Sequence, residues 1–164
     1  MSAADLVPDL LRPGLRIVFC GTALGAASAR ARAYYAGPGN KFWPTLHAIG
    51  LTPRRLAPAE YPRLLDYGLG LTDLAKARSG SDAEVGRAGF DVPRLVAEIE
   101  ANRPGWLAFN GKNAAKHALG LERVGFGPQQ QTLGGVRVFV LPSTSGAANA
   151  YWDIERWQQL ARLA

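Results

Sequence analysis

The sequence predicts an α/β fold, arranged as a single-domain three-layer α/β/α structure with a central, mainly parallel sheet. One observation is that short apolar runs alternate with longer amphipathic segments, which is the pattern of strands joined by helical crossovers. A second is the length of 164 residues with 48% hydrophobic residues, which suits one compact core. Because no repeat or linker interrupts the pattern, we expect residues 1–164 to form one domain.

Four apolar runs are expected to form strands, because each stops at a glycine, a proline or a polar residue. These runs cover residues 15–20, 68–74, 106–110 and 136–141. Helices are expected over residues 40–49, 58–67, 92–102, directly after Gly111, and from about 151 to 163. Asp91 is expected to cap the helix that follows it. Residues 75–89 are polar and contain Gly and Ser, which indicates a mobile surface loop.

Composition narrows the class of protein. The net charge of +6 and the pI near 9.9 favour a polyanionic partner, although many basic proteins bind no nucleic acid. The single cysteine, Cys20, excludes an internal disulfide and a cluster of thiolate ligands, and we expect it to be buried at a strand end. No apolar run approaches the ~20 residues of a membrane span, and no signal-peptide pattern opens the chain. We therefore expect a cytoplasmic protein that does not bind membranes.

Parallel sheets bind ligands beyond the carboxyl ends of their strands. Three loops leave such ends, at residues 21–25, 70–73 and 142–149. Polar and glycine residues gather in these loops, so we expect the functional site there.

Five segments resemble one known family, the mismatch-specific uracil-DNA glycosylase/thymine-DNA glycosylase family. They follow the family's order and span about residues 11–157: Gly21-Thr22-Ala23-Leu24-Gly25, residues 38–43, residues 65–74, residues 109–112 and residues 141–146. The resemblance implies a monofunctional DNA repair enzyme that hydrolyses the N-glycosidic bond of a flipped-out uracil or related mismatched base, as in a G·U pair. It also implies duplex DNA as the partner, no cofactor and no metal.

The match departs from the family at a position that matters for chemistry. The family has an Asn, held to position the attacking water, where this sequence has Ala23. An alanine methyl neither donates nor accepts a hydrogen bond. We expect Asp73 to activate the water and to stabilise the cationic sugar, because it ends the segment at 70–72 at the carboxyl end of a strand. Asp82 is the alternative base, and Asp73 could instead only cap a turn.

The resemblance also implies a pocket for the base. Tyr35 stands where the family has its stacking aromatic residue. Gly21 and Gly25 would let the backbone approach the base closely, with main-chain donors at Thr22 and Tyr35. Asn110 either binds a base edge or caps the helix that follows it. A plain strand-to-helix turn is the alternative explanation of the glycines.

Contacts with the DNA backbone are expected from two lysines and the last loop. The predicted residues are Lys41, Lys112, Ser143, Ser145, Gly146, Ala147 and Asn149. A large apolar wedge is missing from this loop, so Asn149 would help to fill the gap left by the flipped base. Solvated lysines and a Ser-rich turn without a ligand remain open as alternatives.

Other residues carry weaker signals. His47 and His117 lack partners at metal-ligand spacing, and Trp152 and Trp157 are expected to pack in or near the core. A catalytically silent DNA-binding relative is an alternative function, favoured by Ala23. A nucleotide enzyme with a phosphate cradle at residues 21–25 is a third, but the sequence lacks the GxGxxG spacing and a following lysine. We expect a monomer. The range of excised bases stays open.

Overall fold

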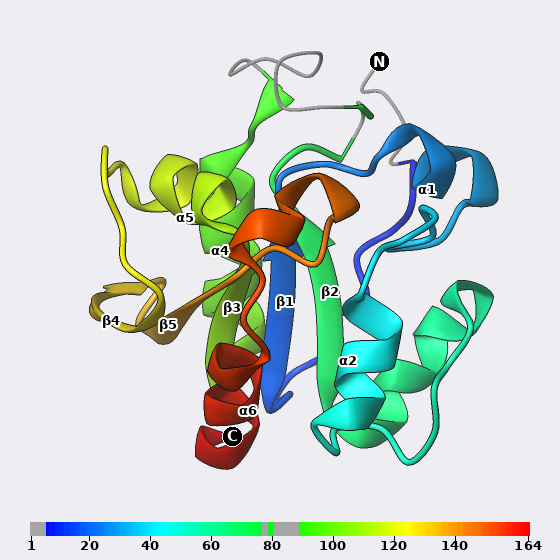
Figure 1. The fold of residues 1–164 in the computed structure, drawn as a ribbon. Coiled ribbons are helices and arrows are strands. Elements are labelled where there is room, and N and C mark those ends of the chain that lie inside the picture. The colour runs from blue at the N-terminus through cyan, green and yellow to red at the C-terminus, as the bar shows by residue number, and fades with distance from the viewer. Residues whose placement is uncertain (1–5, 77–78, 81–88) are drawn as a thin grey trace.

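The computed structural model describes residues 6–76, 79–80 and 89–164, and within them it shows a five-stranded sheet (Figure 1). The strands are β1 (Ile17–Gly21), β2 (Leu69–Asp73), β3 (Trp106–Asn110), β4 (Gly127–Leu133) and β5 (Val136–Leu141). Their order is β2-β1-β3-β5-β4, with β4 antiparallel at one edge and every other pairing parallel. This confirms the predicted α/β class with a mainly parallel sheet.

Helices cover both faces of the sheet, which makes three layers. One face packs against α2 (Phe42–Ala48), the 3₁₀ helix η1 (Pro58–Tyr67) and α6 (Ile154–Leu163). The other packs against α4 (Val92–Asn102) and α5 (Lys112–Leu119). Alternate residues of each strand point to opposite faces, so Phe19 joins the first core and Val18 the second.

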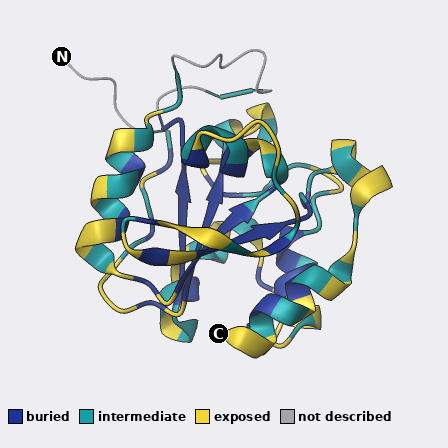
Figure 2. Ribbon diagram, turned by 90° about the vertical axis from the view of Figure 1, so that its left-hand side faces the viewer, coloured by how far each residue is buried: buried dark blue, intermediate teal, exposed yellow. Residues whose placement is uncertain are grey.

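Burial follows from this sandwich. Every residue of β1 and of β2 is buried, as expected of parallel strands covered on both faces. Figure 2 shows the parallel strands in dark blue between helices whose outer faces are exposed. Trp157 of α6 is fully buried, stacks on Phe19 at 5.7 Å and donates from Nε1 to the carbonyl of Pro142 at 3.0 Å. The prediction that Trp157 belongs to the core is confirmed, as is that of a buried Cys20.

Local signals placed the starts of two helices to within two residues. Asp91 caps α4, because its Oδ1 accepts from the backbone N–H of Arg94 at 3.0 Å. The expected helix at 40–49 starts at Phe42, whose N–H donates to Oδ1 of Asn40 at 3.0 Å. None of the described helices is long and apolar enough to cross a membrane.

Other elements differ from the expectations. β4 has the polar sequence GPQQQTL and lies exposed at the sheet edge, so it lacks the apolar run by which the other strands are found. α1 (Ala26–Ala31) is a short helix that was not predicted, and α6 begins later than residue 151, after the 3₁₀ helix η3 (Gly146–Tyr151). The expectation of a mobile surface loop from residue 75 is wrong at its start, because Ala75 and Lys76 are buried. Residues 77–78 and 81–88 of that segment lie outside the described residues.

The register of the sheet assembles the site. Gly21 at the end of β1 pairs with Asp73 at the end of β2, and Asn110 at the end of β3 pairs with Leu141 at the end of β5. The carboxyl ends of these parallel strands therefore meet at one edge. Figure 1 shows η3, in orange, over this edge.

Candidate active site

A cleft of about 880 Å³ lies at the carboxyl ends of the parallel strands. Its volume is in the range of pockets that enclose small organic ligands. All residues predicted to act on the base line it: Gly21, Thr22, Ala23, Gly25, Tyr35, Asp73 and Asn110. Five of the seven predicted DNA-contacting residues line it too: Lys112, Ser143, Ser145, Gly146 and Ala147. Lys41 and Asn149 lie beside it, each next in sequence to a lining residue.

Asp73 is held against the floor of the cleft by β1. Its side chain is 3% exposed, and a Cβ added to Gly21 would lie 2.8 Å from Asp73 Oδ1. Only a glycine at position 21 therefore leaves room for this carboxylate. Asp73 Oδ2 has no hydrogen-bond partner among the described residues, which leaves one buried acceptor available.

Burial raises the pKa of Asp73 from 3.8 to about 7, because the charged carboxylate loses its hydration. Lys76, whose Nζ lies 4.0 Å from Oδ2, and Arg94 lower this pKa, whereas the nearby negative charge of Asp9 raises it. A backbone hydrogen bond with Gly21 also lowers it. Near neutral pH the group is therefore divided between acid and carboxylate, which suits a residue that transfers protons.

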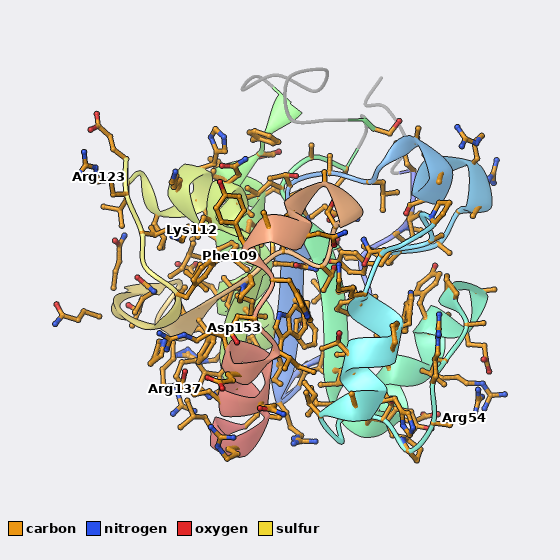
Figure 3. The ribbon with its side chains drawn as sticks, viewed as in Figure 1. Arg54, Phe109, Lys112, Arg123, Arg137 and Asp153 are labelled. Atoms are coloured by element: carbon orange, nitrogen blue, oxygen red, sulfur yellow. The ribbon has the colours of Figure 1, made fainter. Side chains whose placement is uncertain are left out.

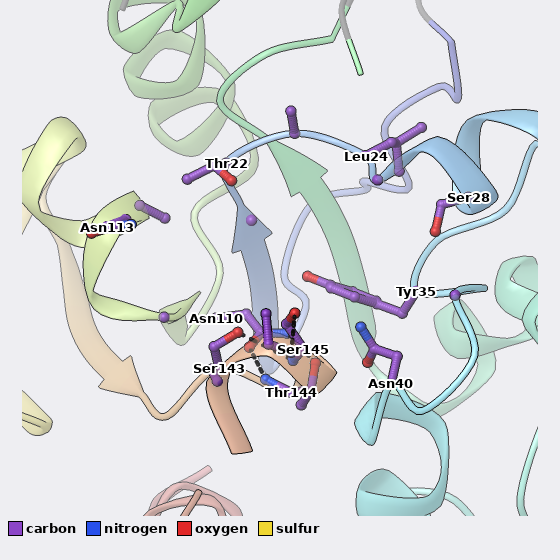
Figure 4. A pocket seen from close by; sticks show the side chains of 18 of the residues that line it. Thr22, Leu24, Ser28, Tyr35, Asn40, Asn110, Asn113, Ser143, Thr144 and Ser145 are labelled. Carbon is purple, nitrogen blue, oxygen red and sulfur yellow. Dashed lines mark hydrogen bonds between the residues drawn. The ribbon is translucent and has the colours of Figure 1, made fainter. Parts of the chain in front are cut away.

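Tyr35 supplies an aromatic surface to the same cleft. Its ring stacks on Phe42 at 4.0 Å with planes 30° apart, so one face is covered by α2. The backbone holds this tyrosine at φ 53°, in the left-handed region that few side chains adopt. Burial and the charge of Asp73 raise the pKa of the Tyr35 hydroxyl, so it stays a neutral donor. In Figure 4 the ring extends across the cleft toward the end of β1.

Asn110 is fixed by a reciprocal pair of hydrogen bonds with Thr144. Its Nδ2 donates to Thr144 Oγ1 at 2.9 Å, and its Oδ1 accepts from the Thr144 backbone N–H at 3.0 Å (Figure 4). The expected alternative, that Asn110 caps the following helix, is wrong: the N-cap of α5 is Gly111, without a side-chain cap. Thr144 thus engages one N–H and one lone pair of the Asn110 amide, which has two of each.

The loop from Ser143 to Ser145 is stabilised by its own hydroxyls. Ser143 Oγ accepts from the Ser145 backbone N–H at 3.2 Å, and Ser145 Oγ accepts from that of Ala147 at 3.3 Å, which caps η3. Both hydroxyls keep their own hydrogen to donate. The serines thus form the predicted turn and also line the cleft.

The two predicted lysines stand at the edges of the cleft. Lys41 Nζ donates to Oδ1 of Asn149 and lies 5.4 Å from the ring centre of Trp152. Lys112, labelled in Figure 3, lines the cleft from the first turn of α5 and lies 4.3 Å from the ring centre of Phe126. The other basic residues labelled there do not line the cleft: Arg123 and Arg137 lie on the left of the view and Arg54 on the right.

Two residues near the cleft were missed by the sequence analysis. Tyr151 ends η3 on the rim and is 74% exposed, a high value for a large aromatic side chain. It was assigned to the start of the last helix, where an aromatic residue gave no sign of a rim position. Lys76 was assigned to a surface loop, and only its apolar neighbours Leu74 and Ala75 hinted at burial. Asp82 lies outside the described residues.

The histidines lie apart from the cleft. Nδ1 of His47 lies 3.4 Å from the carbonyl oxygen of Thr52, and the ring of His117 packs on Phe90 at 4.5 Å. In the described part of the chain, no group of three His, Cys, Asp or Glu residues is arranged to hold a metal ion.

Comparison with known proteins identifies the family. The model of the uracil DNA glycosylase superfamily matches residues 8–162, almost the entire chain. The chain belongs to the uracil DNA glycosylase superfamily. Its fold is also similar to the solution NMR structure of a uracil DNA glycosylase candidate from Methanosarcina acetivorans, with a TM-score of 0.66 and 21% sequence identity. The superposition covers 96% of this chain and 95% of the other, so the likeness concerns the complete fold.

Membership of the uracil DNA glycosylase superfamily supports a role in DNA repair as a DNA N-glycosylase. Proteins of this superfamily act on DNA.

Proposed function

We propose that this chain excises uracil or a related damaged or mismatched base, as in a G·U pair, by hydrolysing the N-glycosidic bond. One observation carries the proposal: a buried carboxylate, Asp73, lies in the same cleft as an aromatic platform, Tyr35. The reaction develops positive charge on the sugar and negative charge on the leaving base. A buried carboxylate stabilises the positive charge on the sugar, and main-chain donors stabilise the negative charge on the base.

In the proposed mechanism the flipped base stacks on the face of Tyr35 that Phe42 does not cover. Backbone N–H groups of Thr22 and Tyr35 donate to the carbonyl oxygens of the base. The second N–H or lone pair of the Asn110 amide, beyond those that bind Thr144, meets another polar group on the edge of the base. Each of these donors gains strength as negative charge builds on the base.

Asp73 carries out the proton transfer in this proposal. Its carboxylate takes a proton from water, and the resulting hydroxide adds to the sugar carbon from which the base leaves. A pKa of about 7 suits this step, because general-base catalysis is most effective when the pKa lies near the working pH. Asp73 thereby replaces the amide that the family has at the position of Ala23. Such a base contributes about 10²–10⁴-fold.

We propose that the DNA backbone lies over Lys41, Lys112 and the loop from Ser143 to Asn149. Donors on the two serines and exposed backbone at Gly146 and Ala147 suit phosphate oxygens. Asn149 is held by Lys41, which limits its reach into the duplex. Tyr151 is better suited to fill the gap left by the flipped base, because it is the large exposed side chain on the rim.

The width of the cleft favours a broad range of bases. Gly21, Ala23, Ala26 and Ala27 line it with small groups, so a purine is not excluded by a bulky side chain there. We also propose that the protein acts as a monomer, since residues of a single chain supply the carboxylate, the aromatic platform and the rim.

The alternative is a catalytically silent DNA-binding protein of the same fold, favoured by Ala23 in place of the family's Asn. A panel of labelled duplexes separates the two functions. It contains uracil opposite G or A, thymine opposite G, hypoxanthine, xanthine and an alkylated cytosine, with an undamaged A·T duplex as the control. Release of uracil from G·U supports the proposal. Tight binding to the mismatched duplexes without release of any base supports the silent binder.

A further inference from the structure

A buried cluster of charges lies behind Asp73, out of the cleft. Lys76, 5% exposed at its side chain, is the centre of this cluster. Its Nζ lies 3.0 Å from Asp9 Oδ1 and donates to the hydroxyl of Tyr34 at 2.8 Å. On the other side of Asp9, Oδ2 lies 2.7 Å from Arg94 Nη1. The cluster thus joins the N-terminal segment, the end of β2 and α4.

The same lysine faces the carboxylate of the proposed reaction. Lys76 Nζ lies 4.0 Å from Asp73 Oδ2, too far for a hydrogen bond but close for a buried pair of opposite charges. Asp9 and Tyr34 fix the ammonium at this distance. A closer approach would turn Asp73 into a permanent ion pair, whereas a lost lysine would leave a buried carboxylate without a nearby ammonium.

The negative charge of Asp9 opposes the effect of Lys76 on the Asp73 carboxylate. It is the nearest acceptor of the ammonium, and Thr72 Oγ1 also donates to its Oδ1 at 2.7 Å. A negative charge at Asp9 offsets part of the lysine's field at Asp73 and disfavours a second carboxylate close by.

Among the other titratable groups described around Asp73, Arg94 also lowers the pKa of the carboxyl group, and the remaining three are neutral. Burial raises the pKa of Tyr35 and of Cys20, and burial with Asp73 does the same for Tyr34, so all three stay neutral through the neutral range. Arg94 donates from Nη2 to the backbone oxygen of Asp73 at 2.6 Å and is already paired with Asp9.

We propose that Lys76 is a positioning residue that keeps Asp73 partly in its carboxylate form, and that Asp9 limits this effect by sharing the charge of Lys76. This inference rests on the proposed role of Asp73 as the base. In the proposed mechanism Lys76 contacts neither the substrate nor the attacking water. It acts only through the charge of its Nζ, which lies 4.0 Å from Asp73 Oδ2.

The test is a ¹³C NMR titration of the Asp73 carboxyl in the full chain, with the pH profile of single-turnover base release measured in parallel. Lys76→Met removes the ammonium and should raise the midpoint of Asp73 by about one pH unit or more. Asp9→Asn removes the opposing charge and should lower the midpoint by a comparable amount. Arg162→Met, an exposed change on α6, controls for the loss of one positive charge.

The rate of base release should change with the titration midpoint of Asp73. If about half of Asp73 is ionised near neutral pH in the wild type, a rise of one unit leaves about a tenth, so Lys76→Met should release base about fivefold more slowly. Asp9→Asn should be up to about twofold faster, and the difference from the wild type should vanish at alkaline pH. A defect that persists at alkaline pH indicates a structural role instead and overturns the inference.

The inference predicts opposite shifts of the Asp73 midpoint for the two variants. If one variant fails to fold, the other is therefore sufficient to test the inference. Midpoints that stay unchanged, or that move in the same direction, overturn the inference and leave the proposed function standing. A wild-type protein that releases no base overturns the proposed function, while the titration still reports on Lys76 and Asp9.

Discussion

Replacing Asp73 with Asn should make the stability of the fold less sensitive to a rise in pH between about 4 and about 7. The folded-state pKa of Asp73 is about 7, above the ordinary value of 3.8 that it regains on unfolding. Between these two values the folded chain therefore binds more protons than the unfolded chain, and the free energy of unfolding falls as pH rises. The amide introduced by Asp73→Asn would keep the shape of the side chain and remove this proton linkage.

The size of the effect follows from the difference between the two pKa values. Each rise of one pH unit in this window lowers the free energy of unfolding of the wild type by about 1.4 kcal/mol relative to Asp73→Asn. From about pH 5 to about pH 7 the wild type should lose about 2–3 kcal/mol relative to Asp73→Asn, with little further change up to about pH 8.

Urea unfolding followed by tryptophan fluorescence measures the difference at about pH 5 and about pH 8, and the four tryptophans supply the signal. Asp66→Asn, which removes an exposed carboxylate, controls for the loss of one negative charge. If the difference in free energy of unfolding between the wild type and Asp73→Asn is the same at both pH values, the raised pKa of Asp73 is refuted. A gap that changes in the opposite direction would show that the carboxylate is stabilised by folding.

Three further substitutions test the site. Gly21→Ala places a Cβ 2.8 Å from Asp73 Oδ1 and should slow base release at least about tenfold in single-turnover assays. Gly125→Ala, with open space around its Cβ, is its control, and equal rates for the two variants would contradict the contact. Tyr151→Ala should slow release from duplex about tenfold and leave single-stranded substrate unaffected, whereas an equal loss on both would argue against a role in filling the helix. Lys41→Gln should weaken binding to all duplexes alike and reduce the salt dependence by about one phosphate contact, so an unchanged salt slope would exclude that contact.

The sequence was sufficient for the layers of the fold, because parallel strands covered on both faces leave continuous apolar runs such as β1. It was insufficient for β4, whose stability comes from pairing with β5 rather than from its own side chains. Local pattern alone could not show that partnership. The same limit applied to η3, since a six-residue 3₁₀ segment with a kink at Ala148 has no periodic signature of its own.

The residues lining the cleft were predicted because several of them end or follow strands that share one edge of the sheet. Gly21, Asp73 and Asn110 all fall in this class. Their mutual distances depend on strand register, which the sequence did not specify. Lys76 and Asp9 were missed because they are distant in sequence and meet only after the N-terminal segment packs across β2, where Leu10 bridges to Leu71.

The measurement closest to the central claim is single-turnover release of uracil from a G·U duplex by the wild type and by Asp73→Asn, at saturating enzyme. We expect release by the wild type and a loss of about 10²–10⁴-fold in the variant, with duplex affinity retained. A variant as fast as the wild type would contradict Asp73 as the base. A wild type that binds the duplex but releases no base would contradict the enzymatic function itself.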